Sequence, residues 1–400
     1  MDRVKRIEGT VTTPKGFLAA GVHCGIKKES LDLALVYSTS LAAAAGVFTR
    51  NQVKAAPVQL SRQRVPGYAQ AIVINSGNAN ACTGLQGLAD AEEMARLVAE
   101  SLGISPEHVL VASTGVIGVP LPMERIRKGI EVITQALGPN GEEAARAIMT
   151  TDSFPKMAAV QVEIGGTVVT VGGMAKGAGM IHPSMATTLC VMTTDAAIEP
   201  HLLQVCLEQA IDRSFNAISV DGDTSTNDSA FLLANGLAKN PPIRREGEEF
   251  ARLQAAVDVV AGELSKLVVR DGEGATKLVE VRVKGALEHT DARKAAEAIA
   301  TSLLVKTALY GGEPNWGRIM AAVGRSGARI QEDRITISIC GEQVVVGGVG
   351  VPGAFEAAAE KLKAKEVVIS VDLGLGPGEA TMWTCDLTEE YVRINSGYMT

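Results

Sequence analysis

Several hallmarks of common protein classes are scarce or missing in this 400-residue sequence. Aromatic residues make up only 4% of the chain, which argues against a nucleic-acid groove built on base stacking. The net charge is −7, so we expect no broad basic face for a phosphate backbone. No run of about 18 apolar residues occurs, and we therefore expect no helix that spans a membrane.

The cysteines lack the spacing that metal and redox motifs require. They lie at positions 24, 82, 190, 206, 340 and 385, and no two of them form a CxxC pair. This spacing excludes the common zinc and thioredoxin-like patterns. Six cysteines in 400 residues are also too few for a disulfide framework, so we expect reduced thiols. The first residues include Glu8 and no apolar stretch, which indicates no targeting signal, and we expect a cytoplasmic protein.

What the sequence does contain is a mixture of helical and extended patterns. Apolar residues recur at helical spacing over 88–102, and Gly103 is placed to end that helix. Two extended segments, 158–164 and 167–172, flank Gly165-Gly166 and predict a hairpin. Further strands are predicted at 33–38, 71–75, 109–112, 279–284, 335–339, 343–347 and 366–372, and further helices at 142–149, 200–213, 247–267, 291–306 and 354–365. This mixture predicts an α/β fold, a layered α+β sandwich with mixed sheets between helices.

A glycine pattern near the C-terminus resembles a dinucleotide-binding loop. Gly348-x-Gly350-x-x-Gly353 follows a predicted strand and precedes a predicted helix. However, Pro352 stiffens the loop, and the 47 residues after Gly353 are too few for the rest of a doubly wound domain. We therefore favour a tight strand-to-helix turn over NAD binding.

The acidic segment 221–228 resembles a calcium loop. An EF-hand needs glycine at its sixth position and glutamate at its twelfth, but these places hold Thr226 and Leu232. We therefore expect a turn closed by Asp, Asn, Ser or Thr side chains.

Two polar segments follow predicted strands and leave two interpretations open. The amide-rich stretch from Asn75 to Asn80 is compatible with turn chemistry and equally with the polar wall of a pocket. Ser113-Thr114-Gly115 is compatible with a turn, or with an oxyanion hole in which the Thr114 hydroxyl and the Gly115 N–H approach one oxygen.

The segment 172–189 stands apart, with the sequence GGMAKGAGMIHPSMATTL. It holds four glycines and a lone lysine, Lys176, before an apolar run that continues without charge to Asp195. Such a loop places backbone amides and hydroxyls in a dry environment, where an amide or carbonyl becomes reactive.

This segment resembles the self-cleavage segment of the ornithine acetyltransferase (glutamate N-acetyltransferase) family of arginine biosynthesis. The resemblance covers essentially the whole chain, with several long motifs in the same order. The matching motifs lie at 46–51, 75–80, 113–115, 150–152, 176–189, 221–227, 271–276, 315–318, 385–388 and 395–400.

The resemblance implies a precursor that cuts itself between Ala186 and Thr187. The Thr187 hydroxyl would attack the Ala186 carbonyl, and water would hydrolyse the resulting ester. The products would be an α chain, 1–186, and a β chain, 187–400, which interleave into one globular unit and assemble as α₂β₂. The freed α-amine, with a reference pKa of about 7.7–8.0, would act as base on its own hydroxyl.

The resemblance also implies the reaction. Acetyl would pass from N2-acetylornithine to Thr187 and then to glutamate, which gives ornithine and N-acetylglutamate by a ping-pong mechanism. The expected partners are these small molecules and not nucleic acid or a membrane, and no cofactor or metal is implied. Whether acetyl-CoA is a further donor stays open. The alternative is a self-processing amidohydrolase or aminopeptidase that passes the acyl group to water.

The same resemblance implies catalytic and substrate-binding roles for residues from several segments. Thr114 and Gly115 would form the oxyanion hole, and Lys176 would pair with the α-carboxylate shared by both amino-acid substrates. The remaining residues would line the pocket: Thr151 as a hydrogen-bond partner of the substrate, Glu273 at the ornithine ammonium or in proton transfer, and Asn395 and Thr400 closing the pocket.

Overall fold

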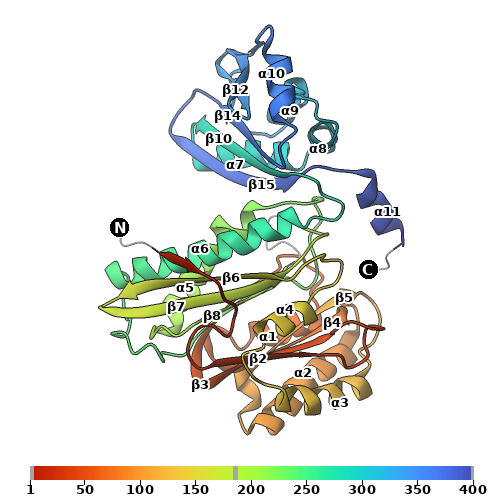
Figure 1. Cartoon of the computed structure of the whole chain (residues 1–400), viewed down its shortest axis with the longest axis vertical. Coiled ribbons are helices and arrows are strands. Elements are labelled where there is room, and N and C mark those ends of the chain that lie inside the picture. Colours follow the sequence, from red (N-terminus) through yellow and green to blue (C-terminus); the bar gives the residue numbers. More distant parts are fainter. Residues whose placement is uncertain (1–3, 183–187, 398–400) are drawn as a thin grey trace. The chain divides into compact units, whose positions relative to one another are not determined.

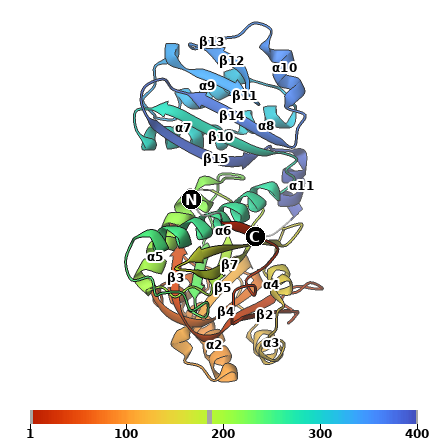
Figure 2. The ribbon, with the colours of Figure 1, turned by 60° about the vertical axis from the view of Figure 1, so that its left-hand side comes forward.

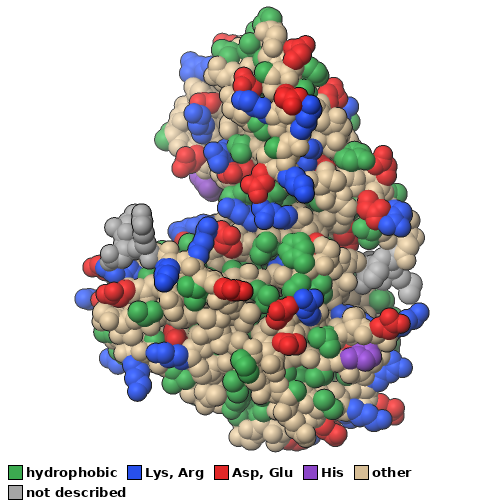
Figure 3. All heavy atoms as spheres, viewed as in Figure 1, with side chains coloured by type: hydrophobic (Ala, Val, Ile, Leu, Met, Phe, Trp, Pro, Cys, Tyr) green, Lys and Arg blue, Asp and Glu red, His purple; other side chains and the backbone are tan. Residues whose placement is uncertain are grey.

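The computed structural model describes residues 4–182 and 188–397, which divide into two compact units (Figures 1 and 2). Unit 1 comprises the described residues up to 216 together with 223–268, and unit 2 comprises 217–222 and 269–397. No helix among the described residues is long and apolar enough to cross a membrane. Positive and negative side chains are interspersed over the face shown in Figure 3.

Unit 1 is built on a mixed sheet that has nine strands within the described residues. The order is β1-β6-β7-β8-β9-β3-β4-β5, and β2 pairs with β3 beside this path. The pairs β4–β5 and β8–β9 are parallel, whereas the other pairs are antiparallel. The strands are β1 Lys5–Ile7, β2 Phe17–Val22, β3 Leu33–Phe48, β4 Gly67–Asn78, β5 Val109–Val116, β6 Lys156–Ile164, β7 Thr167–Lys176, β8 Leu189–Thr194 and β9 Ser229–Ala234.

Helices cover this sheet because each presents an apolar stripe to it. Met94 and Val98 of α2 share a buried cluster with Val73 and Val111 of the sheet, as Ile130 of α3 does. The alanines of α4 join a second cluster, and α6 packs over β7 (Figure 1). The helices of unit 1 are α1 Ala56–Arg62, α2 Gly84–Leu102, α3 Met123–Gln135, α4 Gly141–Ala147, α5 Pro200–Arg213 and α6 Glu248–Arg270, and short 3₁₀ turns occur at Pro106–His108 and Phe215–Ala217.

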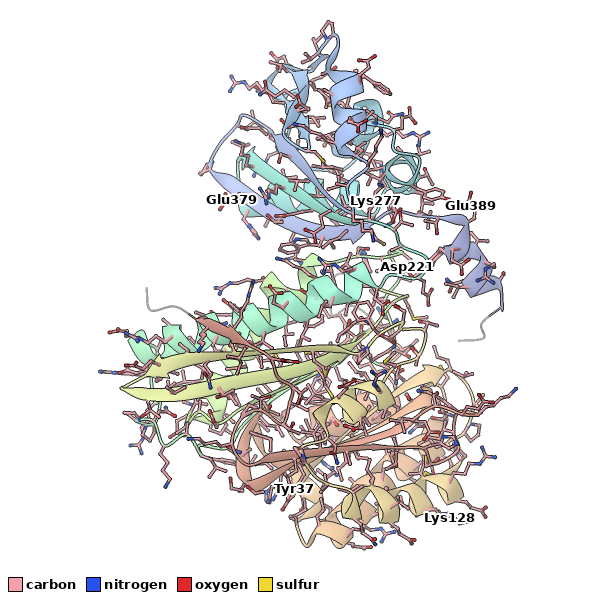
Figure 4. All side chains as sticks on the ribbon, viewed as in Figure 1. Tyr37, Lys128, Asp221, Lys277, Glu379 and Glu389 are labelled. Carbon is pink, nitrogen blue, oxygen red and sulfur yellow. The ribbon has the colours of Figure 1, made fainter. Side chains whose placement is uncertain are left out.

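Unit 2 has its own sheet, with six strands in the order β13-β12-β11-β14-β10-β15 among the described residues. Its core joins Val281 and Ile369 of the strands to Ile299 and Val323 of the helices. Lys277, labelled in Figure 4, donates from Nζ to the Leu362 carbonyl at 2.7 Å. The elements of unit 2 are β10 Leu278–Ala286, α7 His289–Ala300, α8 Leu303–Tyr310, α9 Trp316–Gly324, the 3₁₀ turn Glu332–Arg334, β11 Thr336–Ile339, β12 Glu342–Val346, β13 Val349–Gly350, α10 Ala354–Lys361, β14 Glu366–Asp372, β15 Gly378–Cys385 and α11 Glu389–Gly397.

The mixed α/β class and most predicted elements are confirmed, but one helix prediction is wrong. The predicted hairpin is β6–β7, with Gly165 and Gly166 both at positive φ, and Gly103 ends α2 at a φ of 66°. The predicted single helix over 291–306 is two helices, α7 and α8. Ser302 begins the second helix, because its side chain accepts from the Val305 N–H at 3.4 Å.

The glycine pattern 348–353 forms turns rather than one loop. Gly347 and Gly348 both have positive φ and join β12 to β13, and Gly353 at a φ of 75° precedes α10. A side chain at Gly350 would lie 2.6 Å from the Trp316 ring. The glycines therefore serve tight turns and close packing, and the prediction of a turn leading into a helix is confirmed.

Candidate active site

Both sides of the predicted cleavage bond belong to one sheet. β7 ends at Lys176 and β8 begins at Leu189, and these two residues are paired in register. β8 then pairs with β9. Ala186, Thr187 and Thr400 lie outside the described residues, so their predicted roles stay predictions. Residues 4–182 and 188–397 are described, and the pairing of β7 with β8 joins the proposed α and β chains by backbone hydrogen bonds.

Lys176 and Thr114 meet, although they come from strands that are not neighbours in the sheet. The Lys176 side chain donates from Nζ to the Thr114 Oγ1 at 3.4 Å. Lys176 is 3% exposed and Thr114 is 6% exposed. Two residues that the sequence placed in the site are therefore in contact in a largely dry environment, where charge interactions are strong.

Asp152 lies beside Lys176 and is fully buried. Its Oδ1 accepts from the Lys156 Nζ at 2.6 Å and from the Gly177 N–H at 2.7 Å, and the exposed fraction of both side chains in the ion pair is 0%. Burial, the largest effect, raises the pKa of Asp152, but the charges of Lys176 and Lys156 and the hydrogen bonds outweigh it. The pKa is lowered from 3.8 to about 2. The predicted substrate contact Thr151 is half-buried next to this carboxylate.

The glycine of the predicted oxyanion hole is required by its backbone. Gly115 has a φ of 132° and pairs with Gly77 across the parallel strands β4 and β5. A Cβ at Gly115 would lie 2.3 Å from the carbonyl carbon of Gly77, so any other residue would force the two strand ends apart. The strand ends are thereby held close together beside Thr114.

The amide side chains at the end of β4 and just after it form hydrogen bonds within the protein. Asn75 donates to the Asn78 carbonyl at 2.8 Å and accepts from the Ser113 hydroxyl at 2.6 Å. Asn80 donates to the Gly87 carbonyl at 2.8 Å. These bonds favour turn chemistry for this segment, one of the two interpretations that the sequence left open. The hydrogen bond between Asn75 and Ser113 also links this segment to Ser113-Thr114-Gly115.

Sequence analysis missed Asp228, which anchors the start of β8. Its Oδ1 accepts from the Thr188 N–H at 3.0 Å, and the Ser229 N–H donates to the Thr188 carbonyl at 3.1 Å. The Asp228 Oδ2 and the Thr188 Oγ1 are buried without a hydrogen-bond partner among the described residues. Burial raises the pKa of Asp228 well above its usual value, and the Thr188 N–H and Lys176 offset only part of this effect. The sequence signal that could have identified Asp228 is its position directly before the largely apolar strand β9.

The rest of that acidic segment forms the predicted turn. The Asn227 N–H donates to the Ser225 hydroxyl at 3.0 Å, and the Asn227 side chain donates to the Ser113 carbonyl at 2.8 Å. Asp221, labelled in Figure 4, belongs to unit 2 and accepts from the Tyr391 hydroxyl at 3.2 Å. Within residues 4–182 and 188–397, no group of three or more potential ligands is placed to hold a metal ion.

Glu273 and Asn395, two further predicted site residues, meet within unit 2. The Asn395 Nδ2 donates to the Glu273 Oε2 at 2.6 Å. Glu273 is buried, whereas Asn395 is exposed on α11. The structure therefore brings these two residues together, and their predicted roles toward a substrate stay predictions.

Comparison with known proteins identifies the family. A family model described as the ArgJ family matches residues 18–400. The chain belongs to the ArgJ family. It is 55% identical over 399 residues to the arginine biosynthesis bifunctional protein ArgJ of Symbiobacterium thermophilum, across 98% of this chain and 99% of the relative. The protein of the same name from Geobacter sulfurreducens is 52% identical over 390 residues, with 96% and 99% covered.

Crystal structures of similar proteins have also been solved. The ornithine acetyltransferase of Mycobacterium tuberculosis in complex with ornithine is 44% identical, with 46% of this chain and 99% of that chain covered and a TM-score of 0.41. The bifunctional ArgJ protein of Bacillus halodurans is 43% identical, with 46% and 100% covered and a TM-score of 0.44. Membership of the ArgJ family makes this chain an amino-acid acetyltransferase of arginine biosynthesis.

Proposed function

We propose that this ArgJ-family chain cuts itself between Ala186 and Thr187 and then moves an acetyl group from N2-acetylornithine to glutamate through acetyl-Thr187. The observation that carries this proposal is the buried cluster of Thr114, Lys176 and Asp152 beside the strands that flank the bond. Relatives with the same full-length match are named as bifunctional proteins of arginine biosynthesis, which supports the same reaction.

Self-cleavage follows from a hydroxyl next to its own amide. The Thr187 Oγ attacks the Ala186 carbonyl carbon, the C–N bond breaks, and the amide nitrogen becomes the α-amine of Thr187. Water then hydrolyses the ester and leaves a carboxylate on Ala186. Asp228 supports this step by holding the Thr188 N–H, one residue after the nucleophile, at a fixed position in the sheet.

Acetyl transfer reuses the same hydroxyl. It attacks the acetyl carbonyl of N2-acetylornithine, the free α-amine of Thr187 takes its proton, and ornithine leaves as an amine. The amine of glutamate then attacks the acetyl ester and regenerates the hydroxyl. The Thr114 hydroxyl and the Gly115 N–H would stabilise the negative charge on the oxygen in both steps.

The charges around Lys176 favour a substrate carboxylate. Asp152 is shared between the buried ammonium groups of Lys156 and Lys176, and burial raises the pKa of Asp228, which disfavours the charged form of that second acid. A carboxylate beside Lys176 would therefore reduce the repulsion between the two lysines. Both proposed amino-acid substrates carry an α-carboxylate that meets this need.

The test of self-cleavage compares Thr187→Ala with the wild type on a denaturing gel, followed by N-terminal sequencing. We expect two bands for the wild type, one of which begins Thr-Thr-Leu-Cys, and one full-length band for the variant. Thr188→Ala is the matched control, because it removes the neighbouring hydroxyl but keeps the N–H that Asp228 binds. Cleavage of Thr187→Ala at the same bond would refute the assignment of the nucleophile.

The test of the transfer reaction uses Lys176→Met and separates it from hydrolysis. We expect KM to rise about tenfold or more for both N2-acetylornithine and glutamate, because a charge-assisted contact to each carboxylate is lost. An unchanged KM would remove Lys176 from this role. A rate of acetate release that does not depend on glutamate would instead favour the amidohydrolase.

The proposed assembly is α₂β₂. Pairing of β7 with β8 supports a stable association of the two chains after cleavage, since it joins them within one sheet. We expect a native mass of about twice the 41.7 kDa of one precursor chain. A native mass equal to a single fragment would contradict the assembly.

A further inference from the structure

Unit 1 has a pocket that the proposed transfer does not use. Its volume is about 480 Å³, within the range of pockets for small ligands. The pocket lies where the end of β3, the loop after it, α1 and α5 meet. Its charged lining consists of three cations and one acid: Arg50, Lys54, Arg62 and Glu208.

The two arginines of this pocket are available for a ligand. Arg50 and Arg62 are exposed, and neither makes an ion pair or hydrogen bond to another described residue. Lys54 donates to the Asn51 carbonyl at 2.6 Å, and its charge is likewise not neutralised by a described carboxylate. The pocket therefore has an excess of positive charge in a protein whose net charge is −7.

The acid of the pocket is already engaged with a neutral partner. Glu208 accepts from the Gln204 Nε2 at 2.8 Å. Gln204 is itself fixed, because it accepts from the Gly46 N–H and donates to the Gly46 carbonyl, both at 3.0 Å. Glu208 is thus held at the α5 side of the pocket and bound to an amide rather than to the arginines.

We propose that this pocket binds a ligand that carries more than one phosphate group, with Arg50 and Arg62 on the phosphates. Guanidinium groups bind phosphate oxygens in pairs, which makes arginine suited to this ligand class. Neither N2-acetylornithine nor glutamate carries a phosphate, so the proposed transfer does not account for the pocket.

The pocket is connected to the start of β8. Thr49 lines it, and the Thr49 N–H donates to the Asp228 carbonyl at 3.0 Å while the Thr49 hydroxyl donates to the Ser225 carbonyl at 2.7 Å. Asp228 in turn binds the Thr188 N–H. Two ligand sources share the required chemistry: a nucleotide and a coenzyme A thioester.

The test measures binding to the full-length protein by calorimetry at constant ionic strength, with coenzyme A, ATP and inorganic pyrophosphate as separate probes. We expect binding by the wild type and a loss of affinity of about tenfold for each arginine in the variant Arg50→Gln/Arg62→Gln. Arg245→Gln is the matched control, because Arg245 is an exposed arginine of unit 1 outside the pocket, and we expect it to bind within about twofold of wild type.

The outcomes separate the ligand sources and the two proposals. Tighter binding of coenzyme A than of the other two probes supports the thioester, and tighter binding of ATP supports the nucleotide. Equal binding of all three supports recognition of the phosphate groups alone. No binding by the wild type, or equal binding by the double variant, would overturn the proposal. Transfer from N2-acetylornithine to glutamate is measured on the same samples, and we expect the double variant to retain it, so that loss of the pocket is distinguished from loss of the transferase.

Discussion

The central strands of the two sheets differ in how completely their residues are buried. Every residue of β8 and β9 in unit 1 is buried, whereas β14 in unit 2 alternates between buried and more exposed positions. The nine-stranded sheet is therefore covered on both faces at its centre, and the polar groups at its strand ends lie in a dry interior. The comparison shows why the proposed chemistry belongs to unit 1, since charges act most strongly where water is excluded.

The largest expected effect is on stability, when breaking a buried ion pair is compared with breaking an exposed one. In unit 1, Lys156→Met removes one partner of the fully buried pair with Asp152, and we expect a loss of about 3–5 kcal/mol of stability. In unit 2, Arg282→Gln removes a partner of the solvent-exposed pair with Glu280, and we expect a loss of about 0–1 kcal/mol. Urea unfolding measures both, and equal losses would break the comparison.

A second prediction contrasts two glycines at positive φ. Gly115→Ala places a Cβ against the backbone of Gly77, and we expect a loss of about 3 kcal/mol together with loss of acetyl transfer. Gly353→Ala in unit 2 meets no atom within 4 Å, so it carries only the backbone strain, about 1 kcal/mol. Thermal unfolding of both variants checks this order, and a milder effect at Gly115 would show that the strand ends adapt.

The third prediction uses pH, because two buried acids of unit 1 are shifted in opposite directions. The pKa of Asp152 is lowered to about 2, so its contribution is present above pH 3.8 and is lost as the pH falls through 2. This contribution is about 2 kcal/mol. The difference in stability between wild type and Asp152→Asn should shrink over that interval.

Asp228 should show the opposite sign. Its pKa is raised, so its contribution is present below pH 3.8 and is lost as the pH rises through the raised value. The stability of wild type relative to Asp228→Asn should therefore fall with rising pH, in urea titrations at a series of pH values. The same sign for both acids would contradict the assignment of their protonation states.

Sequence patterns predicted the elements with clear periodicity and missed those without it. The helix α2 and the β6–β7 hairpin followed from regular spacing and from glycines at the turns. The strand β9 is a continuous apolar run, SAFLLA, which does not distinguish a buried strand from a helix. The break before α8 depends on the Ser302 hydroxyl, a single local hydrogen bond that helical periodicity does not reveal.

Sequence analysis selected Thr114 for the oxyanion hole and Lys176 for the substrate carboxylate, and these roles stay predictions. The structure places the two side chains in contact. Asp228 was missed because its hydrogen-bond partner, Thr188, is 40 residues away in sequence and is brought to it by the pairing of β8 with β9. The roles of Thr187 and Thr400 rest on family resemblance, since both residues lie outside the described part of the chain.

The most direct test of the central claim is the intact mass of the purified protein before and after addition of N2-acetylornithine without glutamate. The account predicts two fragments that meet at the Ala186–Thr187 bond, and a gain of one acetyl group on the fragment that begins with Thr187. A single uncut polypeptide of 41.7 kDa, with no acetyl gain after the donor is added, would contradict it.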